Sequence, residues 1–324
     1  MDLRQICIPI RSEVDSVEAF IASHLNSRYS FVQGVTDYVM KNGGKRLRPI
    51  LTIASARLSG YQGEGAVALG TAIEFLHTAS LLHDDVIDNA TLRRGRDAPN
   101  RLWGNHVSVL VGDFFYCRAM DLLVKQGDLK ILRIVTDAVT LTTEGEIFEI
   151  TKTSDLAMSE DDYMEIIGNK TAALMGAASQ TGAILGRVSE EFETSLRRYG
   201  FHLGLAFQLV DDVLDYTQPA DVSGKDSGLD LKEGKLTLPL ILVLKRCTDR
   251  ELKLVREALI SRQIDPASFR EVHKIIDNYD GVRDTLKVAQ GHVQKAKESL
   301  LPFRPSLEQE TLVSIADYVL LRKN

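Results

Sequence analysis

The chain has 324 residues, of which 44% are hydrophobic and 26% charged, proportions that are ordinary for a globular protein with a sizeable core. Its net charge of −6, without a large basic block, argues against binding to nucleic acid. Three separated cysteines, an N-terminus interrupted by charges and no apolar run as long as a membrane span predict a soluble, cytoplasmic protein without a transmembrane segment.

Apolar residues recur at helical spacing over long segments, with eight prolines and no convincing hairpin pattern. This periodicity predicts an all-α fold. No internal repeat, low-complexity tract or boundary divides the sequence, so we expect residues 1–324 to form a single domain. The first helix is expected around Val14 and the second over Phe31–Met40.

A short cationic joint, Lys41–Pro49, follows the second helix. Its two glycines end that helix, and Pro49 suits the first turn of the next one. Lys45 and Arg48 could simply complement the dipole of the preceding helix. They could equally present their charges to a phosphate-bearing ligand.

A long helix is predicted from Glu64 to Asp88, and it ends in the first of two acidic groups. Residues four apart share a helix face, whereas the next residue is rotated by about 100°. Asp84 and Asp88 therefore lie on one face, and Asp85 points to one side. His77, about two turns earlier, is either a core histidine or a residue lining the same cavity.

The segment Asn89–Gly104 is expected to be a loop, and its Arg93 and Arg94 could pair with the acidic group or bind an anion. Further helices are predicted over Val107–Lys125, Leu129–Thr151 and Glu160–Leu185. Within the last of these, Lys170 and Thr171 interrupt an apolar pattern. A lysine there needs an anionic partner.

The second acidic group lies near the end of a helix predicted over Ser189–Tyr216. It repeats the spacing of the first, and the polar residues aligned by threes and fours are Gln208, Asp211, Asp212 and Asp215. The following stretch, Gln218–Gly234, is glycine-rich and polar and contains Lys225. We interpret it as a mobile lid in preference to an ordinary surface loop. Lys235 follows it, and shorter helices complete the chain.

Six carboxylates without a Cys or His cluster suit a hard, oxygen-preferring ion, Mg²⁺ or Mn²⁺. One such group alone would be interpreted as a solvated acidic helix end, but two groups after apolar runs favour metal binding. The candidate ligands are Asp84, Asp88, Asp211 and Asp215, with Asp85 and Asp212 better placed to support them. Acidic groups surrounded by Lys and Arg suit a substrate that carries diphosphate.

The motifs, in order and spacing, resemble those of the trans-isoprenyl (polyprenyl) diphosphate synthases, with the bacterial octaprenyl branch the most similar. The resemblance covers about Gly43 to Pro239 and rests on Gly43-Gly44-Lys45-Arg46-Leu47-Arg48-Pro49, Leu82-His83-Asp84-Asp85-Val86-Ile87-Asp88, Leu92-Arg93-Arg94-Gly95, Lys170-Thr171, Gln208-Leu209-Val210-Asp211-Asp212-Val213-Leu214-Asp215 and Gly234-Lys235-Leu236-Thr237-Leu238-Pro239. It implies an all-α bundle around a deep central cavity, with the acidic groups facing each other across it, and a homodimer.

The resemblance also implies residue roles. Isopentenyl diphosphate would be held by Lys45, Arg48, His77 and Arg94. Mg²⁺ would be bound by Asp84 and Asp88, opposed by Asp211 with Asp215 as a further candidate. The allylic diphosphate would be held by Arg93, Lys170, Thr171, Gln208, Lys225 and Lys235. The residues most directly involved in catalysis would be Asp84, Asp88, Arg93, Lys170 and Asp211.

The implied reaction is ionisation of the allylic carbon–oxygen bond, attack by the isopentenyl double bond and loss of a proton. Ala79 and Ser80, one turn before Asp84, are small, which predicts an open path for a growing chain, with Leu76 and more distant residues setting its end. We expect an all-trans product near octaprenyl, supplied to membrane enzymes for quinone side chains.

The alternatives are a short-chain farnesyl or geranylgeranyl diphosphate synthase, a class I terpene cyclase and a non-catalytic partner subunit. A cyclase has no second diphosphate to bind, so the Lys45 and Arg48 joint argues against it. Consumption of isopentenyl diphosphate by the chain alone would distinguish a synthase from a terpene cyclase and from a non-catalytic partner subunit.

Overall fold

The computed structural model describes residues 2–41, 43–217, 228–261 and 266–322. Apart from two very short strands, the regular structure of these residues is helical, which confirms the all-α prediction. The N-terminal elements are α1 (Leu3–Ile6), η1 (Ile8–Ile10), α2 (Arg11–His24), α3 (Ser30–Lys41), α4 (Leu47–Leu58), α5 (Gly65–Ile87), β1 (Leu92–Arg93), β2 (Arg96–Asp97), α6 (Pro99–Trp103), α7 (Asn105–Gln126) and α8 (Leu129–Lys152). They are followed by α9 (Glu160–Ile167), η2 (Gly168–Ala172), α10 (Ala173–Leu185), α11 (Glu190–Thr217), α13 (Leu229–Lys232), α14 (Leu238–Leu244), α15 (Asp249–Ser261), α16 (Pro266–Asn278), α17 (Gly281–Glu298) and α18 (Leu307–Leu321).

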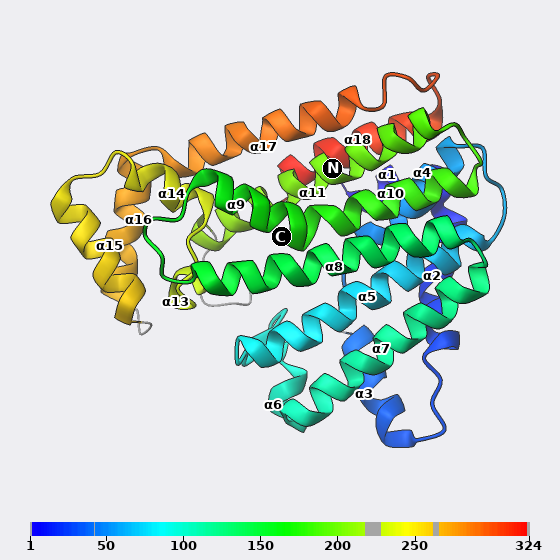
Figure 1. Ribbon diagram of the computed structural model, residues 1–324, viewed down its shortest axis with the longest axis horizontal. Helices are drawn as coiled ribbons and strands as arrows, with labels where there is room; N and C mark the ends of the chain where they lie inside the picture. Colours follow the sequence, from blue (N-terminus) through cyan, green and yellow to red (C-terminus); the bar gives the residue numbers. More distant parts are fainter. Residues whose placement is uncertain (1, 42, 218–227, 262–265, 323–324) are drawn as a thin grey trace.

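The long helices form a bundle, and α14, α15 and α16 extend it at one end (Figure 1). Helix α5 packs against α7 and α4, α10 packs against α4 and α11, and α11 packs against α17. Glycines permit the close crossings. A Cβ at Gly182 on α10 would lie 2.4 Å from the carbonyl oxygen of Thr52 on α4, and one at Gly200 on α11 would lie 2.3 Å from that of Met175 on α10. A larger residue at either point would force the helices apart.

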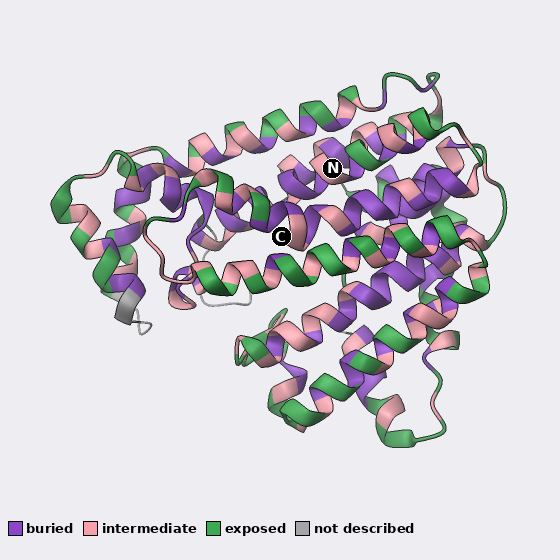
Figure 2. Cartoon of the chain, viewed as in Figure 1, coloured by how far each residue is buried: buried purple, intermediate pink, exposed green. Residues whose placement is uncertain are grey.

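Buried residues form two hydrophobic clusters, and the interior helices are buried along most of their length (Figure 2). The larger cluster joins the helices of the N-terminal half to α10, α11, α17 and α18, and the smaller one lies where α9 and α13–α17 gather. Helix α11 contributes to both, with Leu203 in the first and Leu209 in the second. The single-domain organisation of residues 1–324 stays a prediction.

Helix α5 is long and apolar enough to cross a membrane by composition alone. However, 72% of its most apolar 18-residue window is buried inside the protein. Its apolar character is therefore that of a central core helix, and the acidic group at its C-terminal end emerges from that core.

Two predicted segments differ from the structure, and a third is described only in part. The expected loop over Asn89–Gly104 contains the antiparallel pair β1–β2 and the short helix α6. The expected continuous helix Glu160–Leu185 is interrupted by the π-helical segment η2, whose wider turns carry Lys170 and Thr171. Residues 218–227 of the expected lid, including Lys225, lie outside the described residues, and the lid's last residues form α13.

Candidate active site

The residues of the first acidic group, at the C-terminal end of α5, have different surroundings. Asp85 is only 1% exposed and faces the β1–β2 turn, where Arg93 Nε donates to both of its oxygens at 2.8 Å. Arg93 Nη2 completes the ion pair at 2.7 Å. Asp85 is thus neutralised by a side chain eight residues later, as its rotation off the Asp84 face predicts.

Asp84 has no ion-pair or side-chain hydrogen-bond partner within the described parts of the chain. Burial raises its pKa to about 7, and the charge of Glu146 on α8 adds to that effect. Lys170 and Arg93 act in the opposite direction without offsetting it. A carboxylate in this position is stabilised by an added cation.

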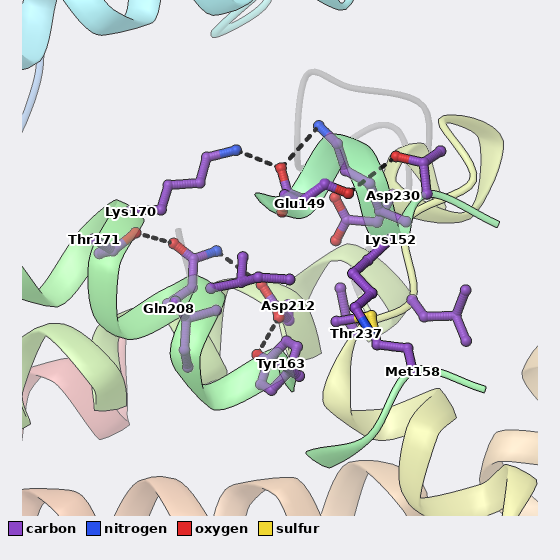
Figure 3. A pocket seen from close by; sticks show the side chains of 15 residues that line it. Glu149, Lys152, Met158, Tyr163, Lys170, Thr171, Gln208, Asp212, Asp230 and Thr237 are labelled. Carbon is purple, nitrogen blue, oxygen red and sulfur yellow. Dashed lines mark hydrogen bonds and ion pairs between the residues drawn. The ribbon is translucent and has the colours of Figure 1, made fainter. Parts of the chain in front are cut away.

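The second acidic group lies near the end of α11, and its middle residue has neutral partners. Asp212 is 4% exposed and accepts hydrogen bonds from the Tyr163 hydroxyl at 2.5 Å and from Gln208 Nε2 at 2.8 Å. Thr171 in η2 donates to Gln208 Oε1 at 2.8 Å, so a continuous chain of bonds joins η2 to Asp212 (Figure 3). Burial raises the pKa of Asp212 to about 7 despite these bonds.

The other two aspartates of this group are already engaged. Asp211 pairs with Arg322 at the C-terminal end of the structure, with Nη2 and Oδ1 2.8 Å apart. The Arg322 guanidinium lies 3.7 Å from the ring centroid of Phe207, and its buried Nε has no hydrogen-bond partner. Asp215 accepts the backbone N–H groups of Leu229 and Asp230 at 3.2 Å, which fixes the start of α13.

Two lysines and three glutamates form an ion-pair cluster that reaches Asp88 of the first acidic group. Lys170 Nζ lies 2.7 Å from Glu146 and 2.6 Å from Glu149, both on α8. Lys235 Nζ lies 3.2 Å from Asp88, 2.8 Å from Glu233 and 3.9 Å from Glu149. The pKa of each lysine is raised because, although burial opposes their charge, these carboxylates favour it more strongly.

A small cavity of about 90 Å³ lies among these groups and is shown from close by in Figure 3. Its lining includes Glu149, Lys170, Lys235 and Asp212, so residues from α8, η2, α11 and the segment after α13 meet around one space. The deep central cavity expected from the resemblance stays a prediction.

A third part of the site, besides the two acidic groups, is formed by the cationic joint between α3 and α4 together with the middle of α5. Burial lowers the pKa of Arg48 to about 10, and its buried Nε has no hydrogen-bond partner among the described residues. Burial, followed by the charge of Arg322, lowers the pKa of Lys45. Burial and then Arg93 lower that of Arg94. Burial, and then the charges of surrounding arginines with Arg48 first among them, lower the pKa of His77 well below its usual value. This excess of positive charge suits an anion.

The residues expected to affect chain length lie on α5, one to two turns before Asp84. Ala79 is 3% and Leu76 5% exposed, and both belong to the larger hydrophobic cluster. Ser80 is half-buried, and its hydroxyl donates to the carbonyl oxygen of His77 at 2.9 Å.

Within the described residues, no three His, Cys, Asp or Glu side chains lie close enough together to form a complete metal site. The available donors are nevertheless carboxylate oxygens, the ligands that Mg²⁺ takes one or two at a time together with substrate phosphates. The unpartnered Asp84 carboxylate also needs a cation. The donor set therefore fits a hard divalent ion that binds together with a diphosphate.

The structure joins Asp88, Lys170 and Lys235 by ion pairs through Glu149, and it joins Thr171, Gln208 and Asp212 by hydrogen bonds. Residues of both networks line the same small cavity, whereas Lys45, Arg48, His77 and Arg94 lie in a separate cationic region. Several of their partners were not singled out from the sequence: Glu74, Glu146, Glu149, Tyr163 and Arg322. Their spacing resembles that of ordinary helix residues. Only a pairing argument for the buried lysines and arginines could have pointed to the glutamates.

Comparison with known proteins gives consistent results. The polyprenyl synthetase family model matches residues 30–276. The chain is 40% identical to octaprenyl diphosphate synthase of Escherichia coli over 80% of each chain. It is 35% identical to the geranyl-diphosphate-specific all-trans-nonaprenyl-diphosphate synthase of Rhodobacter capsulatus over 99% of each.

A solved polyprenyl synthase from Caulobacter crescentus, complexed with calcium and isoprenyl diphosphate, superposes on the chain with a TM-score of 0.96. The two share 38% of their residues, and the match covers 100% of this chain and 98% of the other.

Proposed function

The chain belongs to the polyprenyl synthetase family, and on that premise we propose that it lengthens an allylic diphosphate by successive additions of isopentenyl diphosphate to an all-trans product near octaprenyl. It is a trans-polyprenyl diphosphate synthase, a prenyltransferase. The observation that carries the proposal is that two buried charged groups of opposite sign lack partners among the described residues. There, Asp84 has no ion-pair partner and the buried Arg48 Nε has no hydrogen-bond acceptor.

Asp84 and Asp88, with Asp211 opposite and Asp215 as a further candidate, would hold Mg²⁺, and Mn²⁺ has the same donor preference. Bound metal would neutralise the charge that develops on the leaving diphosphate. The chain's part is to present these carboxylates from two rigid helices. Asp85 and Asp212, each fully engaged by hydrogen bonds, would hold their neighbours in position.

Arg93, Lys170, Thr171, Gln208, Lys225 and Lys235 would bind the allylic diphosphate. Lys170 and Lys235 already converge on Glu149, so their ammonium groups lie close together where an anion could bridge them. Preorganised cations of this kind stabilise the departing diphosphate as the allylic carbon–oxygen bond breaks. Lys225 belongs to this proposal from the resemblance only.

Lys45, Arg48, His77 and Arg94 would bind the diphosphate of isopentenyl diphosphate. Arginine binds such groups through a planar fork, and an imidazole N–H of His77 can donate a hydrogen bond. The second substrate is then held so that its double bond attacks the allylic carbon. The departing diphosphate, not a side chain, would take the final proton.

The small residues Ala79 and Ser80 support a long product, because one helical turn of about 5.4 Å matches roughly one isoprene unit. Leu76 and residues beyond it would end the path. Incubation of the purified chain with farnesyl diphosphate, isopentenyl diphosphate and Mg²⁺ tests this, with product length measured by chromatography. We expect chains near octaprenyl, and products no longer than geranylgeranyl would contradict a long-chain synthase.

Ser80→Phe sharpens the length argument. Its ring would block the path, so we expect a shorter main product while the first condensation continues. Ala79→Phe serves as a second probe of the same face. If both variants give the wild-type product distribution, the growing chain does not pass along this side of α5.

A homodimer is part of the proposal. Large apolar side chains are exposed on α7 and α8, and those exposed by more than half are Leu110, Val124, Leu129, Ile147 and Ile150. A second copy could cover this surface. We further propose that the enzyme acts in the cytoplasm and supplies its product to membrane enzymes for quinone side chains.

A further inference from the structure

The cationic joint between α3 and α4 contains one arginine that is not available to a substrate. Arg46 Nε lies 2.6 Å from Glu18, and Arg46 Nη1 lies 3.2 Å from Glu74. Its Nη2 also donates to the carbonyl oxygen of Met40 at 3.2 Å. All three nitrogens of this guanidinium are therefore engaged, which separates Arg46 from its neighbour Arg48.

The backbone explains why Arg46 needs these bonds. It adopts the left-handed conformation, with φ 49° and ψ 36°, immediately before α4, and its side chain makes no capping bond to the helix. A residue with a Cβ is disfavoured there by about 1–2 kcal/mol, so surrounding contacts must hold it. The turn sets where α4 begins, and Lys45 and Arg48 stand on either side of it.

The two acidic partners of Arg46 differ in their surroundings. The Glu18 side chain is 58% exposed, whereas that of Glu74 is 7% exposed and lies on α5, one turn before His77. A surface pair contributes little, but a buried carboxylate at its ionic partner is costly to disturb. Glu74 also faces the other cations, since its charge favours the protonated forms of Arg48 and Arg94.

We propose that Glu74 is a positioning residue for the isopentenyl diphosphate site, an inference that rests on the function proposed above. Through Arg46 it locks the left-handed turn and so places Lys45 and Arg48. Its charge also offsets the repulsion among Arg46, Arg48 and Arg94, which allows them to gather before the substrate arrives. Glu74 itself touches no substrate.

The test compares Glu74→Gln with Glu18→Gln, which removes the exposed partner of the same arginine. We expect Glu74→Gln to raise the KM for isopentenyl diphosphate about tenfold and to weaken equilibrium binding of that substrate equally, a change worth about 1.4 kcal/mol. The KM for farnesyl diphosphate and kcat should change less than about twofold. Glu18→Gln should leave all three near the wild-type values.

Arg46→Gln should reproduce the Glu74→Gln effect, because both substitutions remove the same Arg46–Glu74 ion pair. For the same reason, the KM of the double variant for isopentenyl diphosphate should be no higher than that of the weaker-binding single variant. Unchanged KM for isopentenyl diphosphate in Glu74→Gln, or equal losses for both substrates, would overturn the inference. If Glu74→Gln does not fold, Arg46→Gln decides the same question by the same split. Failure of the wild type to consume isopentenyl diphosphate would instead refute the proposed function.

Discussion

The two acidic groups have the same spacing, yet the structure compensates their charge in opposite ways. In the group on α5, the middle residue Asp85 pairs with Arg93, and the described residues provide no cationic partner for the first residue, Asp84. In the group on α11, the first residue, Asp211, pairs with Arg322, whereas the hydrogen-bond partners of the middle residue Asp212 in the described part of the chain are neutral.

This difference indicates distinct roles for similar motifs. If the proposed metal site is right, the carboxylate of Asp84 could bind a metal ion without first losing a partner. A metal at Asp211 would have to replace Arg322. Because the charges of both Arg322 and Asp211 act on Lys45, that exchange would be coupled to the cationic region.

The largest effect is expected from removing the uncompensated carboxylate. Asp84→Ala should lower kcat by at least about 10²–10³, the usual consequence of losing a main electrostatic element. Because the Asp84 charge is unfavourable in the metal-free protein, the melting temperature should not fall. Steady-state assays and thermal melts check both statements, with Asp137→Ala, an exposed aspartate on α8, as the control. Near-normal turnover of Asp84→Ala would remove the distinction between the two groups.

A smaller but more selective effect is expected from the cations on either side of α5. Arg48→Ala should chiefly raise the KM for isopentenyl diphosphate, because its guanidinium lies in the cationic joint with an Nε that has no hydrogen-bond partner among the described residues. Arg93→Ala should chiefly impair use of the allylic substrate and also leave Asp85 without its partner. Kinetics with each substrate varied in turn measure this, and equal effects of both variants on both substrates would show that two separate anion sites do not exist.

The smallest effect concerns the middle aspartates in metal-free protein. Asp85→Asn removes the charge opposite Arg93, so its melting temperature should fall by several degrees. Asp212→Asn removes a carboxylate whose pKa is raised from 3.8 to about 7. The Tyr163 hydroxyl can rotate to accept a hydrogen bond from the new amide N–H. The substitution should therefore raise the melting temperature, by roughly 2–4 °C at pH 8.

The pH dependence of this last effect has a defined sign. The folded state retains the Asp212 proton to higher pH than the unfolded state, so stability is lost as pH rises from about 4 to about 7. The gain from Asp212→Asn should accordingly be largest above pH 7 and fade towards pH 4. Thermal melts in EDTA across this range check it, and a gain that is constant with pH would mean that Asp212 does not carry the unfavourable charge.

The sequence predicts the helices and the sides of the acidic residues well, because helical periodicity is local. The positions of Asp85 and Asp212, away from the faces of Asp84 and Asp211, follow from rotation about the helix axis alone. The side chains that pair with the acidic residues cannot be predicted in this way. Arg322 reaches Asp211 from 111 positions along the chain, and Tyr163 reaches Asp212 from 49 positions away. The π-helical turn at η2 likewise has no local sequence signal.

We propose that this chain, acting alone, joins isopentenyl diphosphate to an allylic diphosphate with a divalent metal. The direct measurement is incorporation of labelled isopentenyl diphosphate by the purified chain with farnesyl diphosphate and Mg²⁺, before and after addition of EDTA. We expect repeated incorporation that stops in EDTA. Conversion of farnesyl diphosphate without uptake of label, no activity in the absence of another subunit, or full activity in EDTA would contradict it.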